Sequence, residues 1–315
     1  MRESRTFAER TKILASDESI KKYFFVYEGS DTELIYFDAI NNLKQDIEIS
    51  PLIELIPLVR SFGETGWSNP KKILDRVIRN LEESKTGCIT YETLLNRIMD
   101  YFFEEKLITT SKKQAESIWK TLKWICEENL HKLLTANVDD IESKCNTIVE
   151  LLQQESELIN VVSDIAKIIK NSGITYSEGF DKICLIVDRD RKSFVSKPEN
   201  NQYEYVLNKC KENNFGFYIT NPCFEFWLLL HFDQVHTIDK MQLLKNEKVS
   251  KKKCFAEQEL KKLLVGYEKS SYNAEELVRN IDKAIVNEKK FCEDPEGLEN
   301  KIGSNIGLLI EELRK

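Results

Sequence analysis

A short apolar segment followed at once by two acids is the feature that most constrains this chain. Residues 182–187 read KICLIV, and Asp188 and Asp190 come directly after them. A continuous apolar run of this length is typical of a strand buried on both faces, as in the parallel sheets of α/β proteins. Residues 21–27 (KKYFFVY) give the same signal and stop at Glu28. We therefore expect a sheet in which two buried strands end in carboxylates.

Further strand and helix signals alternate along the chain. Strand signals fall at residues 52–59 and 215–220, and helix signals at residues 30–41, 71–83 and 201–213, with another helix opened by Asn221-Pro222. This alternation predicts a mostly parallel, Rossmann-like α/β sheet flanked by helices. Pro57 lacks an amide hydrogen, so its strand should lie at the edge of the sheet or end early.

Residues 86–172 have a different character. Strand signals are nearly absent there, and three amphipathic segments follow one another. We expect an α-helical insertion with its own small core. It would divide a discontinuous catalytic domain of residues 20–85 and 173–315, whose last part, from about residue 237, reads as helical and lysine-rich.

Composition narrows the function classes. The net charge of −7 excludes a uniformly basic nucleic-acid binder but leaves room for a local basic patch. Eight cysteines occur without a CxxC pair, which favours buried free thiols over zinc ligands or disulfides. No apolar run is long enough for a membrane helix, and the charged N-terminus is unlike a secretory signal. We expect a cytoplasmic protein without a membrane partner.

The strand-end acids predict a metal site. If the strands before Glu28 and Asp188 are neighbours, their carboxyl ends meet at one edge of the sheet. Asp188 and Asp190 differ by two positions, so in extended chain their side chains point the same way. Oxygen ligands of this kind suit Mg²⁺ or Mn²⁺. The alternatives are solvated strand-end residues, or the metal–diphosphate site of a DxD sugar-nucleotide transferase.

Two further glutamates are candidates for the same site. Glu33 completes the capping-box sequence that begins at Ser30, so helix initiation alone would explain it, but it could also face the cluster. Glu225 is a lone acid in the apolar sequence CFEFWLLLHF and needs either a metal or a basic partner, since an unpaired buried charge costs several kcal/mol. His231 lies on a different helical face from Glu225 and reads as a hydrogen-bonded core residue.

Three ordered motifs resemble the RloB-like family. FFVYEGSDTELIYF is similar to the EGxxTExxYF opening of these proteins, KICLIVDRD to their second motif, and NPCFEFWLLLHF to their most distinctive one. The segment from Trp67 to Pro70 resembles a divergent form of their SxP or SDP element. The resemblance covers residues 20–85 and 175–235 with a looser C-terminal part, and residues 86–172 have no counterpart in shorter members.

The resemblance implies a TOPRIM-type domain similar to that of OLD-family nucleases, often encoded in bacterial defence loci. It implies that Glu28 is the acid/base candidate, that Asp188 and Asp190 hold metal, and that Glu33 and Glu225 help to hold a second ion. A metal-dependent nuclease acting on DNA or RNA in antiviral defence follows as the expectation. OLD proteins fuse an ATPase to this domain, but no GxxxxGK[ST] occurs here, so any ATPase would be a separate partner.

Basic residues flank the acidic motifs and could contact the phosphate backbone. They also have the simpler reading of solvated surface charge. The candidates are Arg189, Arg191, Lys192, Lys251, Lys252 and Lys253, with Lys269 as a further phosphate contact. Two other functions stay open: a TOPRIM-type nucleotidyl or phosphoryl transferase, and a non-catalytic sensor module of a defence system. The sequence also leaves open a homo-oligomer.

Overall fold

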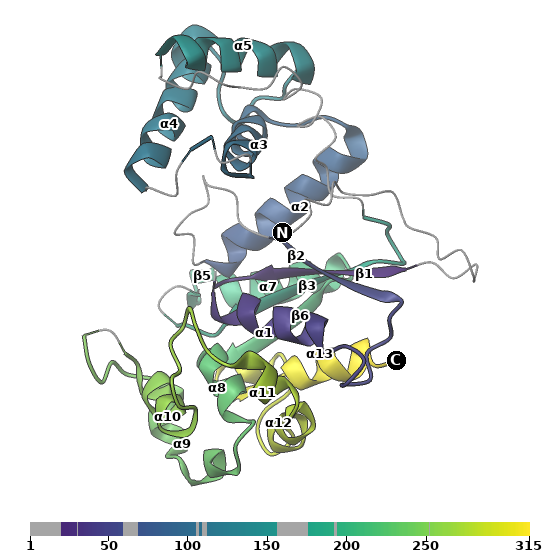
Figure 1. The fold of residues 1–315 in the computed structure, drawn as a ribbon, viewed down its shortest axis with the longest axis vertical. Helices are drawn as coiled ribbons and strands as arrows, with labels where there is room; N and C mark the ends of the chain where they lie inside the picture. The colour runs from purple at the N-terminus through teal and green to yellow at the C-terminus, as the bar shows by residue number, and fades with distance from the viewer. Residues whose placement is uncertain are drawn as a thin grey trace. The chain divides into compact units, whose positions relative to one another are not determined.

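The chain divides into two compact units. The structure is a computed structural model, and it describes residues 20–29, 31–58, 69–104, 107–108, 112–155, 176–191, 194–251 and 253–315. One unit is helical and comprises the described part of residues 76–176. The other is an α/β unit formed by the described parts of residues 10–59, 67–75 and 177–315 (Figure 1).

A mainly parallel five-stranded sheet forms the centre of the α/β unit. Its strands run in the order β2-β1-β3-β6-β7, and the first four are parallel while β7 is antiparallel to β6. The strands are β1 (Lys21–Tyr27), β2 (Ile53–Leu58), β3 (Lys182–Asp188), β6 (Gly216–Asn221) and β7 (Gly303–Ser304). The expected α/β sheet is confirmed, and β2, which contains Pro57, is an edge strand as predicted.

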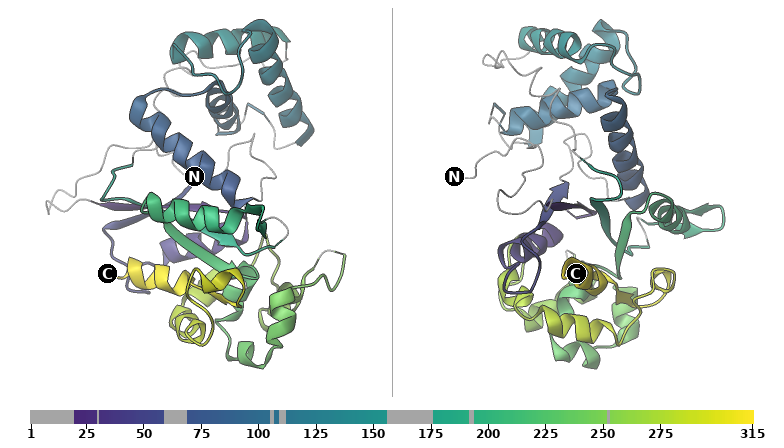
Figure 2. Two further views of the ribbon diagram at one scale, coloured as in Figure 1. Left: turned by 180° about the vertical axis from the view of Figure 1, so that it is seen from behind. Right: turned by 90° about the vertical axis from the view of Figure 1, so that its right-hand side faces the viewer.

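Helices cover both faces of this sheet. Tyr23, Phe25 and Tyr27 of β1 join a large buried cluster with helix α1 (Thr32–Asn42) and the C-terminal helices, whereas Phe24 and Val26 are buried on the opposite face. Helix α7 (Gln202–Glu212) covers that second face, as the reverse view in Figure 2 shows. Burial on both faces explains why these strands read as continuous apolar runs.

The C-terminal third of the α/β unit is built from short helices. They are α8 (Phe224–Leu229), α9 (Lys240–Lys245), α10 (Phe255–Leu263), α11 (Ala274–Val278), α12 (Ile281–Glu288) and α13 (Ile306–Leu313), with 3-10 turns at Asp233–Thr237 and Gly297–Glu299. A two-stranded hairpin, β4 (Ser196–Lys197) and β5 (Asn200–Asn201), precedes α7. The helical expectation missed strand β7, which is only two residues long.

The helical unit has a core of its own. Helix α2 (Pro70–Thr86) leads into it, followed by α3 (Tyr91–Glu104), α4 (Lys112–Trp124), a π-helical turn (Ile125–Asn129) and α5 (Ile141–Glu155). Leu94, Ile98, Phe102, Leu122 and Ile148 are fully buried in its apolar cluster. The third amphipathic segment predicted from the sequence falls largely on residues 156–175, outside the described residues.

Two local predictions about helix starts are wrong. Asn221 is not a helix cap but the last residue of β6, where it pairs with Gly303 of β7. Its side-chain Nδ2 donates to the Leu298 carbonyl oxygen at 2.8 Å. The apolar helix begins only at Phe224 and is shorter than expected. Asp31, rather than Ser30, directly precedes α1, and Asp31 makes no side-chain capping bond.

One carboxyl group is buried without a positive partner. Glu288 on α12 is 0% exposed, and its Oε1 accepts a hydrogen bond from the Gly307 amide of α13 at 3.1 Å. Its Oε2 has no hydrogen-bond partner among the described residues. A Cβ at Gly307 would collide with this oxygen, so the glycine is what permits the close approach.

Two general expectations can be compared with the described residues. None of their helices is both long enough and apolar enough to cross a membrane. All eight cysteines are free thiols, with Cys126, Cys145, Cys184 and Cys210 buried, as the absence of paired spacing predicted.

Candidate functional site

The strand order creates a crevice between β1 and β3. From β1 the chain crosses to β2 on one side, and from β3 it crosses to β6 on the other side. The connections therefore leave in opposite directions at the β1–β3 junction, which is where open α/β sheets bind ligands at the carboxyl ends of their strands. Glu28 follows β1 directly and Asp188 ends β3, so the predicted convergence of these two acids is confirmed.

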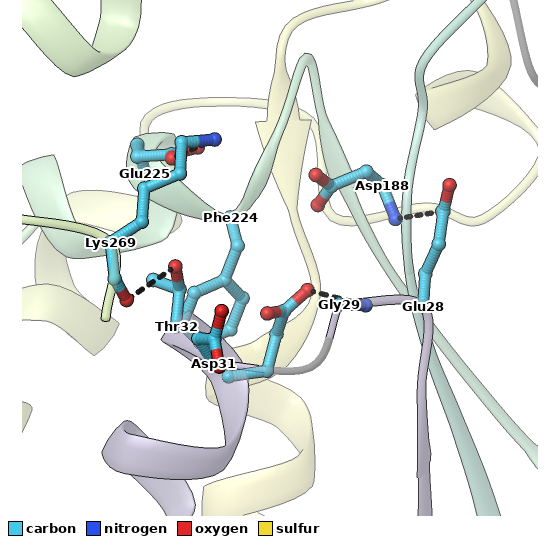
Figure 3. Close-up of a pocket in the computed structure, with 9 residues that line it drawn as sticks. Glu28, Gly29, Asp31, Thr32, Asp188, Phe224, Glu225 and Lys269 are labelled. Carbon is cyan, nitrogen blue, oxygen red and sulfur yellow. Dashed lines mark hydrogen bonds and ion pairs between the residues drawn. The ribbon is translucent and has the colours of Figure 1, made fainter. Parts of the chain in front are cut away.

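A pocket of about 290 Å³ occupies this crevice (Figure 3). It contains five carboxylates and a single cationic side chain. Its lining residues are Glu28, Gly29, Asp31, Thr32, Glu33, Asp188, Phe224, Glu225 and Lys269. They come from the ends of β1 and β3, the start of α1, the start of α8 and the loop before α11, so the fold gathers acids from four separate segments.

Glu28 and Asp188 are joined through the backbone. The amide of Asp188 donates to Glu28 Oε2 at 3.1 Å, across a sequence separation of 160 residues. The amide of Glu28 in turn donates to the Ile186 carbonyl oxygen at 3.1 Å and extends the pairing of the two strands. These two bonds fix the Glu28 side chain at the end of β3.

Gly29 lets the Glu33 carboxylate fold back towards the strand. The Gly29 amide donates to Glu33 Oε1 at 3.1 Å, and a Cβ at position 29 would collide with the same carboxylate. Glu33 is therefore held by the residue that follows Glu28. This contact explains in physical terms why a glycine stands between the two acids of the EGSDTE sequence.

Glu225 has a basic partner. It lies in the first turn of α8, and its Oε1 is 2.8 Å from Lys269 Nζ, while Tyr267 donates to the same oxygen at 3.4 Å. The Lys269 loop is attached to α1, because Thr32 donates to the Lys269 carbonyl oxygen at 3.2 Å and Tyr272 donates to the Thr32 carbonyl oxygen at 2.7 Å. The requirement for a partner of this lone acid is thus met by a lysine within the structure.

The excess of acidic groups in the pocket raises the pKa values of two of its carboxyl groups. The pKa of Asp188 lies well above its usual value, because burial removes water from the carboxylate and because Glu33, Glu28 and Glu225 add like charge. Burial also raises the pKa of Glu33, and Glu225 adds to that effect. These two carboxyl groups retain protons at pH values where an isolated acid is ionised.

Lysine relieves only part of this repulsion. Burial would raise the pKa of Glu225, but the charge and hydrogen bond of Lys269 outweigh it and lower that pKa. In the same way Glu225 raises the pKa of Lys269 despite the cost of burying the lysine. The ammonium group is therefore fully charged at neutral pH, and one cation faces five acids.

The donor set fits a divalent cation in charge and chemistry. Carboxylate oxygens are the ligands that Mg²⁺ and Mn²⁺ prefer. Among the described residues, no three acidic, histidine or cysteine side chains already surround one coordination position. The pocket therefore supplies the oxygen ligands and the negative charge that a divalent cation needs. Its carboxylate side chains would have to rotate to surround the ion.

Other predicted site residues lie elsewhere. Asp190 is exposed and is not among the residues that line the pocket, because β3 ends at Asp188 and the alternation that aligned the two acids ends with it. Arg191 and Lys251 are exposed and Lys253 is partly exposed, whereas Lys192 and Lys252 lie outside the described residues.

Arg189 differs from the other basic candidates because its side chain is buried. It is 4% exposed and donates to two backbone carbonyl oxygens, those of Glu299 at 3.1 Å and Phe194 at 2.7 Å.

His231 is a core residue, as predicted. Its Nε2 is 2.9 Å from the Tyr36 hydroxyl, and its Nδ1 is 3.2 Å from the carbonyl oxygens of Trp227 and Leu228. Burial lowers the pKa of His231 to about 4, so the ring is neutral at physiological pH. It does not line the acidic pocket.

Sequence reasoning missed several lining residues. Gly29, Asp31, Thr32 and Phe224 had not been selected. For Gly29 a signal was present, because a glycine directly after a strand-end acid permits a close side-chain approach. Thr32 is a fixed position of the EGxxTExxYF pattern, but its contact with the Lys269 loop, 237 residues further along the chain, cannot be read from neighbouring residues.

Comparison with known proteins identifies the family. The family model described as RloB-like protein matches residues 107–313, which is more than half of the chain. The match contains Asp188, Glu225 and Lys269 and extends into the helical unit, whereas Glu28 and Glu33 precede it. No solved structure matches the chain. The extent of the family match shows that this chain belongs to the RloB-like protein family.

Proposed function

We propose that this RloB-like chain carries a TOPRIM-like catalytic domain and is a Mg²⁺- or Mn²⁺-dependent nuclease that cleaves phosphodiester bonds in DNA or RNA. We further propose that it acts in the cytoplasm in antiviral defence. One observation carries the proposal: five carboxylates and one lysine share a single pocket at the switch point of a parallel sheet. A phosphodiester can approach such a pocket only when cations neutralise the acids.

Residues of this pocket divide into two proposed roles. Asp188, Glu33 and Glu225 would hold the metal, with Asp190 supplying a further carboxylate if it turns towards them. A bound divalent ion supplies charge neutralisation at the phosphate and lowers the pKa of a water molecule. Glu28, whose carboxylate accepts a hydrogen bond from the Asp188 amide, would accept a proton from the attacking water.

Lys269 provides charge of the opposite sign at the rim of the pocket. Its side chain is 58% exposed although its Nζ is bonded to Glu225, so the ammonium faces both the acids and solvent. A positive group in this position could contact a non-bridging phosphate oxygen as negative charge develops. A neutral replacement would test this role without removing a carboxylate.

The decisive experiment compares substrates and metals directly. Purified protein is incubated with plasmid, single-stranded DNA and total tRNA, with and without Mg²⁺ or Mn²⁺. We expect metal-dependent cleavage of at least one substrate without added nucleotides, and its loss in Glu28→Gln and Asp188→Asn. Exposed Glu275→Gln on α11 is the matched control and should cut normally. Full activity of either site variant would remove the proposed site.

A phosphoryl or nucleotidyl transferase is the main alternative, because the same pocket could serve transfer as well as hydrolysis. Product formation that requires an added nucleotide, with no shortening of the nucleic acid alone, would favour it. A non-catalytic sensor is a further alternative, which the separate apolar core of the helical unit makes physically reasonable. A biological effect that survives both site substitutions would favour the sensor.

A further inference from the structure

A second pocket, basic in character, lies at the same strand end. Its volume is about 320 Å³. It is lined by Arg189, Arg191, Val195, Ser196, Lys197 and Asn300. Three of these side chains are cationic and none is acidic, so the pocket has the opposite charge to the crevice that contains Asp188.

Arg189 is held rigidly in this pocket. Its Nε and Nη1 donate to the carbonyl oxygens of Glu299 and Phe194, and its guanidinium lies over the Tyr203 ring with 5.1 Å to the ring centre. No described residue accepts a hydrogen bond from Nη2. A guanidinium fixed by its other nitrogens is preorganised to present the remaining donors to an anion.

The cations of the pocket repel one another. Burial lowers the pKa of Arg189, and the charge of Arg191 lowers it further, while Glu299 acts in the opposite direction. Glu299 is nearby but accepts a hydrogen bond from the Ser196 hydroxyl. Arg191 and Lys197 are exposed, and Arg191 makes one long contact of 3.5 Å, to the Asn300 carbonyl oxygen. A bound anion would relieve this repulsion.

The two pockets are one residue apart on the chain. Asp188 is the last residue of β3, and the Arg189 amide still donates to the Thr220 carbonyl oxygen of β6 at 2.8 Å. The Arg189 guanidinium lies over the Tyr203 ring of α7, whereas Asp188 shares its pocket with residues at the starts of α1 and α8. The end of β3 therefore has the acidic pocket on the face covered by α1 and α8 and the basic pocket on the face covered by α7.

A nucleic-acid strand carries a negative charge on every nucleotide, so a strand bound at the acidic pocket has neighbouring phosphates that a cationic pocket beside it can bind. We propose that the basic pocket binds a phosphate group of the nucleic-acid strand whose scissile phosphodiester occupies the acidic pocket. This inference rests on the proposed nuclease function. The bound group is either an internal phosphodiester close to the cut or a terminal phosphate at a strand end.

The test measures binding without cleavage. Fluorescein-labelled single-stranded oligonucleotides are titrated in Mg²⁺ with the full chain carrying Glu28→Gln, which removes cleavage, and anisotropy gives Kd over a series of NaCl concentrations. The pocket variant carries Arg191→Ser and Lys197→Ser, both at exposed positions. The control variant carries Lys283→Ser on α12 and Lys289→Ser at its C-terminal cap, whose side chains are 43% and 53% exposed, and it loses the same charge.

We expect the pocket variant to bind on the order of tenfold more weakly than the control variant. The slope of log K against log salt should fall by about 0.7, the value for one lost phosphate contact on a single strand. Inorganic phosphate should compete with the oligonucleotide on the wild-type chain more strongly than on the pocket variant. Equal binding and equal salt slopes in the two variants would overturn the proposal.

Two further comparisons separate the possible outcomes. An oligonucleotide with a 5′-phosphate that binds more tightly than its 5′-hydroxyl counterpart identifies a terminal phosphate as the ligand, and equal binding identifies an internal phosphodiester. Weaker binding by the pocket variant, with no cleavage by the wild type under any metal, would refute the nuclease but keep the phosphate pocket. Metal-dependent cleavage with unchanged binding by the pocket variant would refute the pocket alone.

Discussion

The buried Glu288 carboxyl group should make the stability of the α/β unit depend on pH in a specific way. Burial raises the pKa of Glu288 to about 8, and the amide of Gly307 offsets this only in part. The native protein therefore holds a proton that the unfolded chain releases near pH 4.5. Because the native state binds more protons between these values, the free energy of unfolding falls as pH rises from about 4.5 to about 8.

The size of this effect follows from the shift. The pKa of Glu288 rises from 4.5 to about 8 on folding. At roughly 1.4 kcal/mol per pKa unit, the free energy of unfolding changes by about 5 kcal/mol over the full pH window. About 2 kcal/mol of this falls between pH 6 and pH 8. For a unit of this size that corresponds to roughly 4–8 °C in melting temperature.

Glu288→Gln tests the reasoning because glutamine cannot ionise and keeps the oxygen that accepts from Gly307. We expect the wild type to lose about 2 kcal/mol more than the variant between pH 6 and pH 8, as measured by urea denaturation at each pH. Other titrating groups are common to both proteins and cancel in this difference. Exposed Glu275→Gln should follow the wild type. Parallel pH profiles for wild type and Glu288→Gln would show that the carboxyl does not titrate as its burial requires.

Three further predictions concern the acidic pocket. Gly29→Ala should lower the cleavage rate about 10–100-fold with little change in melting temperature, since the new Cβ displaces the Glu33 carboxylate; a normal rate would contradict this. Mg²⁺ should raise the melting temperature more at pH 8.5 than at pH 6. The pKa values of Asp188 and Glu33 are raised, so at pH 6 metal binding must displace protons from these carboxyl groups. Asp188→Asn should reduce this pH dependence. Lys269→Met should destabilise the metal-free protein by about 1–2 kcal/mol, which is less than the loss of one partner costs in a fully buried ion pair. Mg²⁺ should restore much of this stability. An unchanged urea midpoint would refute a stabilising Glu225–Lys269 pair.

Local sequence patterns predicted the centre of this fold well. The apolar runs before Glu28 and Asp188 are buried on both faces, so their hydrophobicity alone marked two adjacent strands. The rule that sites form at the carboxyl ends of parallel strands then brought the two acids together correctly. Pro57 correctly indicated an edge strand, since an edge position tolerates a missing amide hydrogen.

The errors arise where tertiary contacts override local preference. Asn221 has the sequence of a helix cap, yet its side-chain Nδ2 donates to the Leu298 carbonyl oxygen and the strand continues through it. Asp190 was aligned with Asp188 by strand periodicity, but the strand ends between them. The Glu225–Lys269 pair depends on a loop that no periodic pattern places beside α8. None of these contacts can be read from a window of neighbouring residues.

The discontinuous sheet also has a consequence for synthesis on the ribosome. Glu28 and Asp188 are 160 residues apart, and Thr32 and the Lys269 carbonyl oxygen it contacts are 237 apart. At about 5–20 residues per second, β1 emerges roughly 8–32 s before the strand end that Glu28 must meet. The helical unit, whose core comes from one continuous stretch, can fold during that interval. Unfinished or prematurely terminated chains therefore lack a complete acidic pocket. The acids and Lys269 come together only when synthesis of the chain is nearly finished.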